Sequence, residues 1–522
     1  MRGAPAAVAA LVVAACLAVG AAGPAPVTVA GGRLTGVAGR DAAVTVFKGI
    51  PFAAPPVGPR RWKAPEPAPA WNGVRAADRF APACVQNVAG ARLPWTAEFM
   101  HQGAVDEDCL YLNVWTAGSR GARRPVLVYI YGGGFNEGSG SVALYDGEAL
   151  AKKGLVVVTF NYRVGVFGFL SHPDLAAESP HAASGNYGLL DQVAALRWIQ
   201  DNIATFGGDP ANVTIAGQSA GAMSAYLLTA SPRTRGLFHR AIVQSGPGGL
   251  ASFGIASARG LAQPRTVAAQ AGAAFAKAHG AATLQALRDR PARELLAPLT
   301  GNPPVRFGPV IDGWLLTDDI EAVYATGRQQ DVPLLTGMNA DEGSAFAGYG
   351  TATAAAFRDQ ARTRFGERAE QFLTLYPAAS DADAARAQMR SARDGALVSL
   401  QALASQRAAT ATTPSYLYYF ERAIPWPEHP EYGAFHTGEV PYVFANLALL
   451  KRPWTAVDRA LADVASSYWV RFATTGNPNG PGLPSWPAFM PKVPEVMVLG
   501  AASKARMLPD DARRLFFERA MN

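Results

Sequence analysis

The sequence of 522 residues has few of the features that mark special classes of protein. Charged residues make up only 17% and hydrophobic residues 49%, so the composition shows no bias toward disorder. The net charge is +7, but the basic residues are mostly single arginines. The closest group, Arg120, Arg123 and Arg124, is short and lacks interleaved aromatic residues, which argues against a nucleic-acid partner. Internal repeats and long linkers are absent, so we expect residues 23–522 to form one large domain.

Long apolar runs are also missing beyond the N-terminus, so no later stretch could cross a bilayer. The N-terminus reads MRGAPAAVAALVVAACLAVGAAG, in which Arg2 precedes an apolar stretch and small residues follow. We interpret residues 1–22 as a signal peptide cleaved near Ala22, which predicts a secreted or periplasmic protein. Lipid attachment at Cys16 is one alternative, although the apolar run continues past this cysteine. An uncleaved anchor is another, although alanine and glycine are weakly hydrophobic for a permanent span.

Cysteine is scarce, with three residues in the whole chain. Export would remove Cys16 with the signal and leave Cys84 and Cys109 as an even pair in an oxidising compartment. A bridge between them would close a loop of about 25 residues and stabilise the fold by about 3–4 kcal/mol. Two free thiols are the alternative. Neither cysteine lies in a C-x-x-C motif or near a pair of histidines, so we expect no metal site.

Short apolar strands alternate with helices along most of the chain. This alternation predicts an α/β fold, in which helices cover both faces of a mostly parallel central sheet. The alanine-rich segments 251–300 and 350–410 carry helical charge patterns and are predicted as helical insertions. Helices are expected at 189–206 and 220–230, and strands within the segments 26–37, 42–53, 124–135, 154–164, 212–217, 240–246, 332–343 and 415–423.

The segment Gly217-Gln218-Ser219-Ala220-Gly221 has the pattern G-x-S-x-G, which also occurs by chance in many proteins. Here an apolar strand ends at Gly217 and a helix begins just after Ser219, as a nucleophilic serine of this kind requires. The glycines are needed because the tight turn places the serine in a strained backbone region where neighbouring Cβ atoms would clash. The helix directs its first N–H groups toward developing negative charge. We therefore predict that Ser219 is a nucleophile; the alternative is a structural turn of small residues.

A serine nucleophile needs a base, and the chain has only seven histidines. In such an arrangement the acid and then the histidine follow the serine. Three histidines precede Ser219 and two follow it closely, which leaves His429, near two prolines, and His436 in GAFHTGEVPYVF. The loop around His436 contains glycine and threonine, which give an imidazole access to a pocket. We predict His436 as the base.

The segment VPLLTGMNADEG supplies Asp341 and Glu342 just past the end of a predicted strand, where sites in parallel sheets lie. Either carboxylate could orient the histidine, and periodicity does not choose between them. Upstream, the run YGGGF at 131–135 follows another strand, and its bare backbone N–H groups suit an oxyanion hole. The run matches neither phosphate-binding glycine pattern and lacks the lysine, so a phosphate loop is excluded.

Taken together, these residues resemble the type-B carboxylesterases, the α/β-hydrolase group that includes the cholinesterases. The resemblance covers nearly all of the chain after the signal and includes the segments FKGIPFAAPPVGPRRW, EDCLYLNVW, YGGGFNEGSGS, NYRVGVFGFLS, NADEGSAF and FHTGEVPYVF. It implies an α/β-hydrolase fold and hydrolysis of small-molecule carboxylic esters through an acyl-enzyme, without a metal or organic cofactor. An amidase, lactonase or carbamate hydrolase would use the same machinery. A catalytically silent binding module is a further alternative.

Residue by residue, the resemblance implies that Ser219 is the nucleophile, His436 the general acid–base and Glu342, rather than Asp341, the orienting acid. The oxyanion donors would be the backbone N–H groups of Gly133, Gly134 and Ala220. Cys84 and Cys109 fall where the family closes its first disulfide loop, and Ser245 corresponds to a buried serine that supports the triad.

The resemblance does not define the substrate or the oligomeric state. Trp95 lies in the loop between the two cysteines, but too far before Cys109 to support specificity for choline esters. We expect the pocket walls to come from this loop, from the alanine-rich insertions, and from the segments around Phe135 and Phe346.

Overall fold

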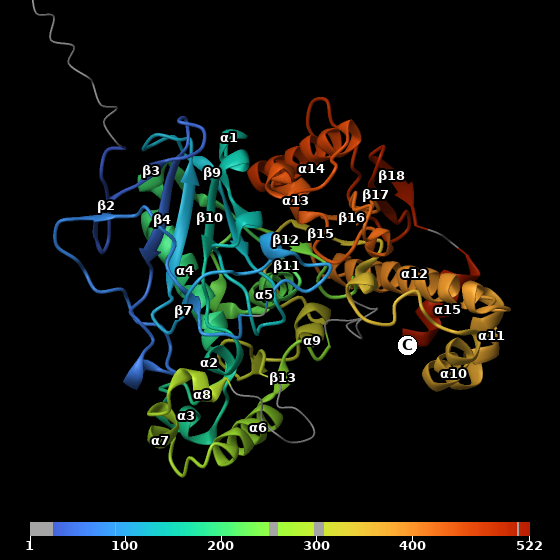
Figure 1. Cartoon of the computed structure of the whole chain (residues 1–522), viewed down its shortest axis with the longest axis horizontal. Helices are drawn as coiled ribbons and strands as arrows, with labels where there is room; N and C mark the ends of the chain where they lie inside the picture. The colour runs from blue at the N-terminus through green and yellow to red at the C-terminus, as the bar shows by residue number, and fades with distance from the viewer. Residues whose placement is uncertain (1–23, 89, 250–258, 297–306, 509–510, 522) are drawn as a thin grey trace, which may run out of the picture.

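The computed structural model describes residues 24–88, 90–249, 259–296, 307–508 and 511–521 (Figure 1). The predicted signal peptide, residues 1–22, lies outside the described residues, and so does Cys16. The described part of the chain is built around a mixed sheet of 11 strands. In chain order these are β3 (Val37–Ala38), β4 (Thr45–Pro51), β8 (Tyr111–Thr116), β9 (Arg124–Ile130), β10 (Val156–Phe160), β11 (Gly208–Gln218), β12 (Arg240–Gln244), β15 (Leu334–Asn339), β16 (Ser415–Phe420), β17 (Glu495–Leu499) and β18 (Lys504–Met507).

The strands lie in the spatial order β18-β17-β16-β15-β12-β11-β9-β10-β8-β4-β3. Every neighbouring pair from β17 to β10 is parallel, and antiparallel strands extend the sheet at both edges. The predicted mostly parallel sheet is thus confirmed. Strand β9 lies between β10 and β11, so the chain leaves it toward one side and later returns on the other. The carboxyl ends of β9 and β11 consequently meet at one edge, where sites in such sheets form.

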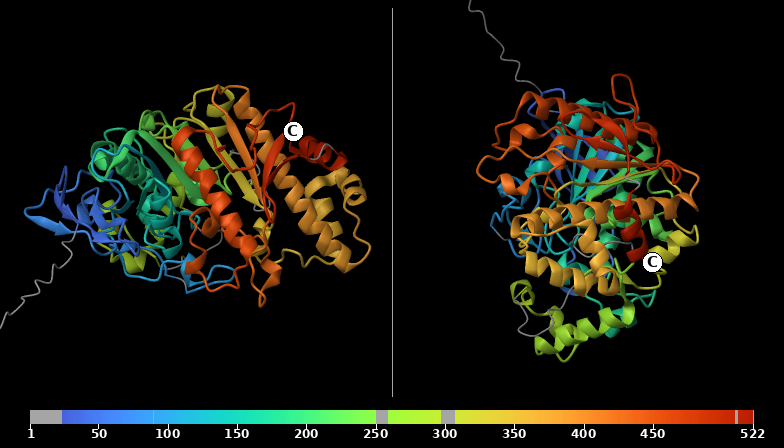
Figure 2. Two further views of the ribbon diagram at one scale, coloured as in Figure 1. Left: turned by 90° about the horizontal axis from the view of Figure 1, so that it is seen from above. Right: turned by 90° about the vertical axis from the view of Figure 1, so that its right-hand side faces the viewer.

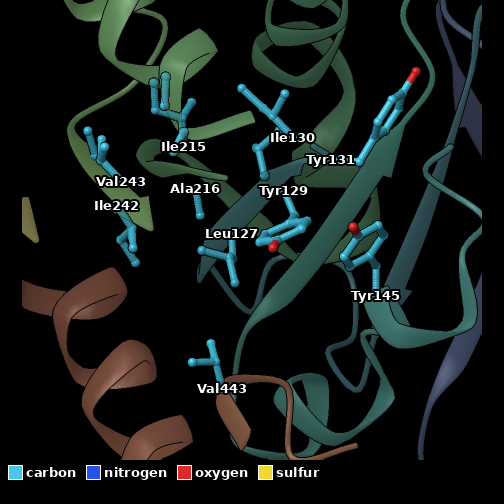
Figure 3. Packing of buried hydrophobic residues seen from close by; sticks show 14 of the residues in the cluster. Leu127, Tyr129, Ile130, Tyr131, Tyr145, Ile215, Ala216, Ile242, Val243 and Val443 are labelled. Carbon is cyan, nitrogen blue, oxygen red and sulfur yellow. The ribbon is translucent and has the colours of Figure 1, made fainter. Parts of the chain in front are cut away.

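Helices cover both faces of the parallel strands. Leu127 and Ile242 point to the side of Val443, whereas Ile215 and Val243 point to the opposite side (Figure 3). Helix α14 (Ala456–Thr475) packs against β9 and β11, while α5 (Ala220–Ala230) packs against β11 and β12. All five residues of β10 are buried, which explains why this strand is continuously apolar instead of alternating.

Two helical insertions extend from the sheet, as the alanine-rich segments predict. The first forms α6 (Arg265–Ala278), α7 (Leu284–Arg288) and α8 (Ala292–Leu295) next to α3 (Pro173–Glu178). The second forms α10 (Ala354–Phe365), α11 (Ala369–Leu375) and α12 (Asp381–Ala408), which gather with α15 (Ala512–Met521) at one side of the molecule (Figures 1 and 2). This second lobe has its own hydrophobic core, built on Phe357, Phe372, Tyr376, Phe516 and Phe517.

The remaining elements surround this framework. The predicted helix 189–206 is observed as α4 (Tyr187–Asn202) followed by the 3-10 turn η4 (Ile203–Phe206). None of the helices in the described ranges combines the length and apolar character that a membrane span needs. The other elements are β1 (Val27–Val29), β2 (Gly32–Thr35), β5 (Val74–Ala76), β6 (Ala83–Cys84), β7 (Val105–Asp106), β13 (Gln263–Pro264), β14 (Val310–Ile311), α1 (Glu148–Lys152), α2 (Gly165–Phe169), α9 (Ile320–Ala325) and α13 (Val440–Val443).

Candidate active site

Ser219 lies on the turn between β11, which ends at Gln218, and α5, which begins at Ala220. Its φ of 58° is in a region that residues with a Cβ rarely adopt. The turn is fixed by the backbone N–H of Ser219, which donates to the carbonyl of Gln244 at 3.0 Å. A Cβ at Gly221 would lie 2.0 Å from the carbonyl oxygen of Ile130, so only glycine fits there. The turn therefore holds a strained serine at the carboxyl end of the sheet.

His436 and Glu342 are in direct contact, although 94 residues separate them in sequence. The imidazole Nδ1 donates to Glu342 Oε2 at 2.5 Å, and the two residues are only 5% and 2% exposed. Glu342 begins the 3-10 turn η7 (Glu342–Ala345) after β15. Its other oxygen accepts hydrogen bonds from the Asn339 backbone N–H at 2.8 Å and from Ser245 Oγ at 2.6 Å. These donors fix the carboxylate, and with the proton on Nδ1 the lone pair of the neutral ring is on Nε2.

The neighbouring carboxylate, Asp341, has different partners. It forms an ion pair with Arg393 and accepts the backbone N–H of Ala434 at 3.0 Å. His429, the other histidine left open by the sequence, forms a hydrogen bond with Glu431 at 3.0 Å. The geometry therefore joins Glu342 to His436, and it joins neither Asp341 nor His429 to this pair.

A third side chain at His436 was not anticipated from the sequence. The Gln218 side-chain nitrogen lies 3.1 Å from His436 Nε2 and 3.3 Å from Nδ1, and Gln218 is 2% exposed. Within the described ranges, no hydrogen bond joins Ser219 Oγ to His436. The sequence signal that could have indicated Gln218 is its position immediately before the serine, because the turn brings that residue to the histidine.

A second carboxylate, Glu439, lies behind the pair and was also missed. Its two oxygens accept hydrogen bonds from Gln244 Nε2 at 3.0 Å and Asn339 Nδ2 at 2.6 Å. Burial, followed by the charge of Glu342, raises the pKa of Glu439 to about 7. Asn339 thus connects both carboxylates, through its side chain to Glu439 and through its backbone to Glu342.

This raised pKa predicts a pH-dependent stability. The folded state holds the Glu439 proton up to a pH of about 7, whereas an unfolded glutamate releases it near 4.5. The free energy of unfolding should therefore fall as the pH rises from 4.5 to 7, by about 3 kcal/mol from this group. Urea unfolding of the protein and of Glu439→Gln at pH 5 and pH 8 measures it. Stability relative to the variant should be lower at pH 8; an equal difference at both pH values contradicts the prediction.

The glycine run 131–135 forms a tight loop after β9. Gly133 and Gly134 have φ values of 116° and 62°, and a Cβ at Gly133 would lie 2.2 Å from the carbonyl oxygen of Glu137. The Gly133 carbonyl accepts the backbone N–H of Asn136 at 3.0 Å, which closes the loop. Ala220 is the first residue of α5, so its N–H has no acceptor within the helix. The backbone N–H groups of Gly133, Gly134 and Ala220 thus lie on two segments: the glycine loop after β9 and the start of α5.

Ser219, His436, Gly133 and Gly134 line one cavity of about 920 Å³. This volume is within the range of sites that bind small molecules. Phe346 contributes to the wall as predicted, and so do residues of the 84–109 loop and of α8. The segment around Phe135 also lines the cavity as predicted, through Gly134 and Asn136. The Phe135 side chain itself is buried against Phe169, with ring centroids 5.3 Å apart.

The disulfide between Cys84 and Cys109 is present, as predicted. Within the loop that it closes, Trp95 Nε1 donates to Thr437 Oγ1 at 3.2 Å, and the indole lies edge-on to the His436 ring with centroids 6.3 Å apart. The same indole also contacts the Phe346 ring at 5.8 Å. The disulfide loop therefore forms a wall directly beside the histidine.

The parallel sheet, the serine on its strained turn and the buried His–Glu pair together define an α/β-hydrolase. The chain belongs to the carboxylesterase family, which it matches over residues 24–514. It is 40% identical over 487 residues to a fumonisin B1 esterase from Sphingopyxis macrogoltabida, with 89% of this chain and 85% of the relative covered.

The solved structures that the chain resembles are also esterases. A PNB esterase is 34% identical with a TM-score of 0.76, and a thermophilic PNB esterase is 33% identical with a TM-score of 0.78. Each comparison covers 94% of this chain and 99% of the solved chain. The family and these relatives identify the protein as a carboxylic-ester hydrolase.

Proposed function

We propose that this esterase works through an acyl-enzyme on Ser219, with His436 as general base and acid and Glu342 as the orienting carboxylate. The observation that carries the proposal is the buried hydrogen bond between Glu342 and His436 Nδ1, beside a cavity that Ser219 lines. This bond fixes the tautomer in which Nε2 can accept a proton, and the carboxylate stabilises the imidazolium that then forms.

In the first step, Ser219 Oγ bonds to the ester carbonyl carbon while its proton passes to His436 Nε2. The oxygen of the tetrahedral intermediate accepts hydrogen bonds from the N–H groups of Gly133, Gly134 and Ala220, which replace hydration at a buried position. The bond to the alcohol then breaks, and the alcohol leaves with the proton from His436. Water that His436 deprotonates attacks the acyl-enzyme, releases the acid and restores Ser219.

For the substrate, we propose carboxylic esters with a bulky acyl or alcohol part. The cavity of about 920 Å³ supports this proposal, because a short ester fills only a small part of such a volume. A relative at 40% identity carries the name fumonisin B1 esterase, so fumonisin B1 belongs among the test substrates.

A substrate panel tests this assignment. We expect kcat/KM to rise from the acetyl to the longer-chain p-nitrophenyl esters, and to stay measurable for a tertiary-alcohol ester and for fumonisin B1. Amide, lactone and carbamate analogues of the best ester are the matched controls, since they need the same machinery but a different leaving group. Faster turnover of one of these analogues than of every ester would contradict the proposal.

We also propose that residues 23–522 form one exported domain, released by cleavage near Ala22. The disulfide supports export, because such bonds persist in oxidising compartments. N-terminal sequencing of the protein recovered from periplasm and culture medium measures the cleavage position.

A further inference from the structure

Gln218 contacts His436, and this contact has no part in the proposed acyl-enzyme mechanism. Its side-chain nitrogen lies 3.1 Å from Nε2 and 3.3 Å from Nδ1 of the same ring. An atom that lay in the plane of the imidazole ring at both of these distances would overlap the ring carbon that joins the two nitrogens. The amide therefore lies over the ring face, with its N–H edge against both nitrogens, and it is held there because Gln218 is almost fully buried.

The charged group in contact with the imidazole favours its protonated form. Glu342 accepts the Nδ1 proton directly, whereas Glu439, three residues after the histidine, keeps its own proton up to a pH of about 7 and is uncharged on the acid side. Asp341 is neutralised by its ion pair with Arg393. An imidazolium cannot accept the serine proton, so the Glu342 carboxylate stabilises a form that is inactive as a base.

The amide of Gln218 has the opposite effect. Its N–H edge carries partial positive charge, which is attracted to the π face of a neutral imidazole and is repelled by an imidazolium. The Gln218 amide is neutral at every pH. The turn at Ser219, the next residue, fixes its place in the chain. The amide therefore provides a constant bias toward the neutral ring.

We propose that Gln218 is a positioning residue that holds His436 in its neutral, proton-accepting form in the resting enzyme. This inference rests on the proposed function, because Gln218 acts only through His436 as the base for Ser219. It predicts that the identity of residue 218 sets the pH at which ester hydrolysis declines on the acid side.

The test compares kcat/KM against pH for the protein, Gln218→Glu and Gln218→Met on one p-nitrophenyl ester. In Gln218→Glu a carboxylate replaces the amide over the ring, so the acid limb should move up by about 1 pH unit. At a pH one unit below the original midpoint, activity relative to the plateau should then be about tenfold lower. Gln218→Met removes the N–H group at similar length and should move the limb in the same direction by a smaller amount.

Asn477→Asp is the charge control, because Asn477 is an exposed residue that does not line the cavity. It adds the same charge without contacting His436, and the acid limb should keep its position. Superimposed profiles for all variants would overturn the role of Gln218 and leave ester hydrolysis intact. If Gln218→Glu fails to fold, an unchanged pH profile of Gln218→Met is sufficient by itself to overturn the role of Gln218. An inactive parent protein would instead remove the proposed function and, with it, this inference.

Discussion

Replacement of Ser219 by alanine should lower kcat for a p-nitrophenyl ester by about 10⁵-fold or more. The substitution removes the oxygen that forms the acyl-enzyme, and no other hydroxyl is placed on the strained turn beside the glycine loop. The fold should persist, since alanine needs no more space than serine and the turn is held by backbone groups. Steady-state kinetics, together with labelling by a fluorophosphonate probe, measure both the loss of turnover and the loss of the nucleophile.

Ser245→Ala is the matched control for this experiment. Ser245 also has a left-handed φ, of 50°, and is fully buried near the site, but its hydroxyl donates to Glu342 rather than facing the cavity. Loss of a hydrogen bond to a charged group costs about 1.5–3 kcal/mol, so we expect a decrease of about 10- to 100-fold with labelling retained. Turnover near the parent level in Ser219→Ala would exclude this serine as the nucleophile.

The sequence was most informative where function depends on local geometry. The run G-x-S-x-G between an apolar strand and a helix indicated the turn at Ser219, because a Cβ at Gly217 or Gly221 would lie 2.4 or 2.0 Å from neighbouring backbone atoms. The alternation of strands and helices likewise indicated a mostly parallel sheet. The antiparallel strand β8 was harder: it lies in EDCLYLNVW and carries no alternation, since five of its six residues are buried.

Contacts between distant segments could not be derived from local pattern. Local pattern left Asp341 and Glu342 equivalent, and only the family resemblance favoured Glu342. The path of the chain after β15 turns Glu342 toward His436 and Asp341 toward Arg393. Gln218 and Trp95 meet the histidine from two distant segments, so their spacing in sequence carries no signal of the contact. Glu439 is only three residues from the histidine, but its link to Glu342 depends on Asn339 of a distant strand. Local pattern did indicate the segment around Phe135 as a wall of the cavity, although the Phe135 side chain is itself buried.

Asp341 and Glu342, the two adjacent carboxylates after β15, are expected to respond differently to substitution. Glu342→Gln should lower kcat by about 10³- to 10⁴-fold. The amide keeps the size of the side chain but cannot stabilise an imidazolium at 2.5 Å. The substitution also replaces one carboxylate oxygen with an NH₂ group. Glu342 accepts hydrogen bonds from Ser245 and from the Asn339 backbone, so in the variant one hydrogen-bond donor must face another. The loss should appear in kcat more than in KM, because the charge on the imidazole develops in the transition state.

Asp341→Asn is the decisive comparison, because it makes the same chemical change one residue earlier. Its ion pair with Arg393 and its bond to the Ala434 N–H support the loop rather than the imidazole. We therefore expect kcat within a few-fold of the parent, and a decrease in the free energy of unfolding of about 1–2 kcal/mol. Kinetics and urea unfolding of both variants separate the two roles. If Asp341→Asn lost activity and Glu342→Gln retained it, the carboxylate that orients His436 would have to be reassigned to Asp341, which would require this loop to rearrange during catalysis.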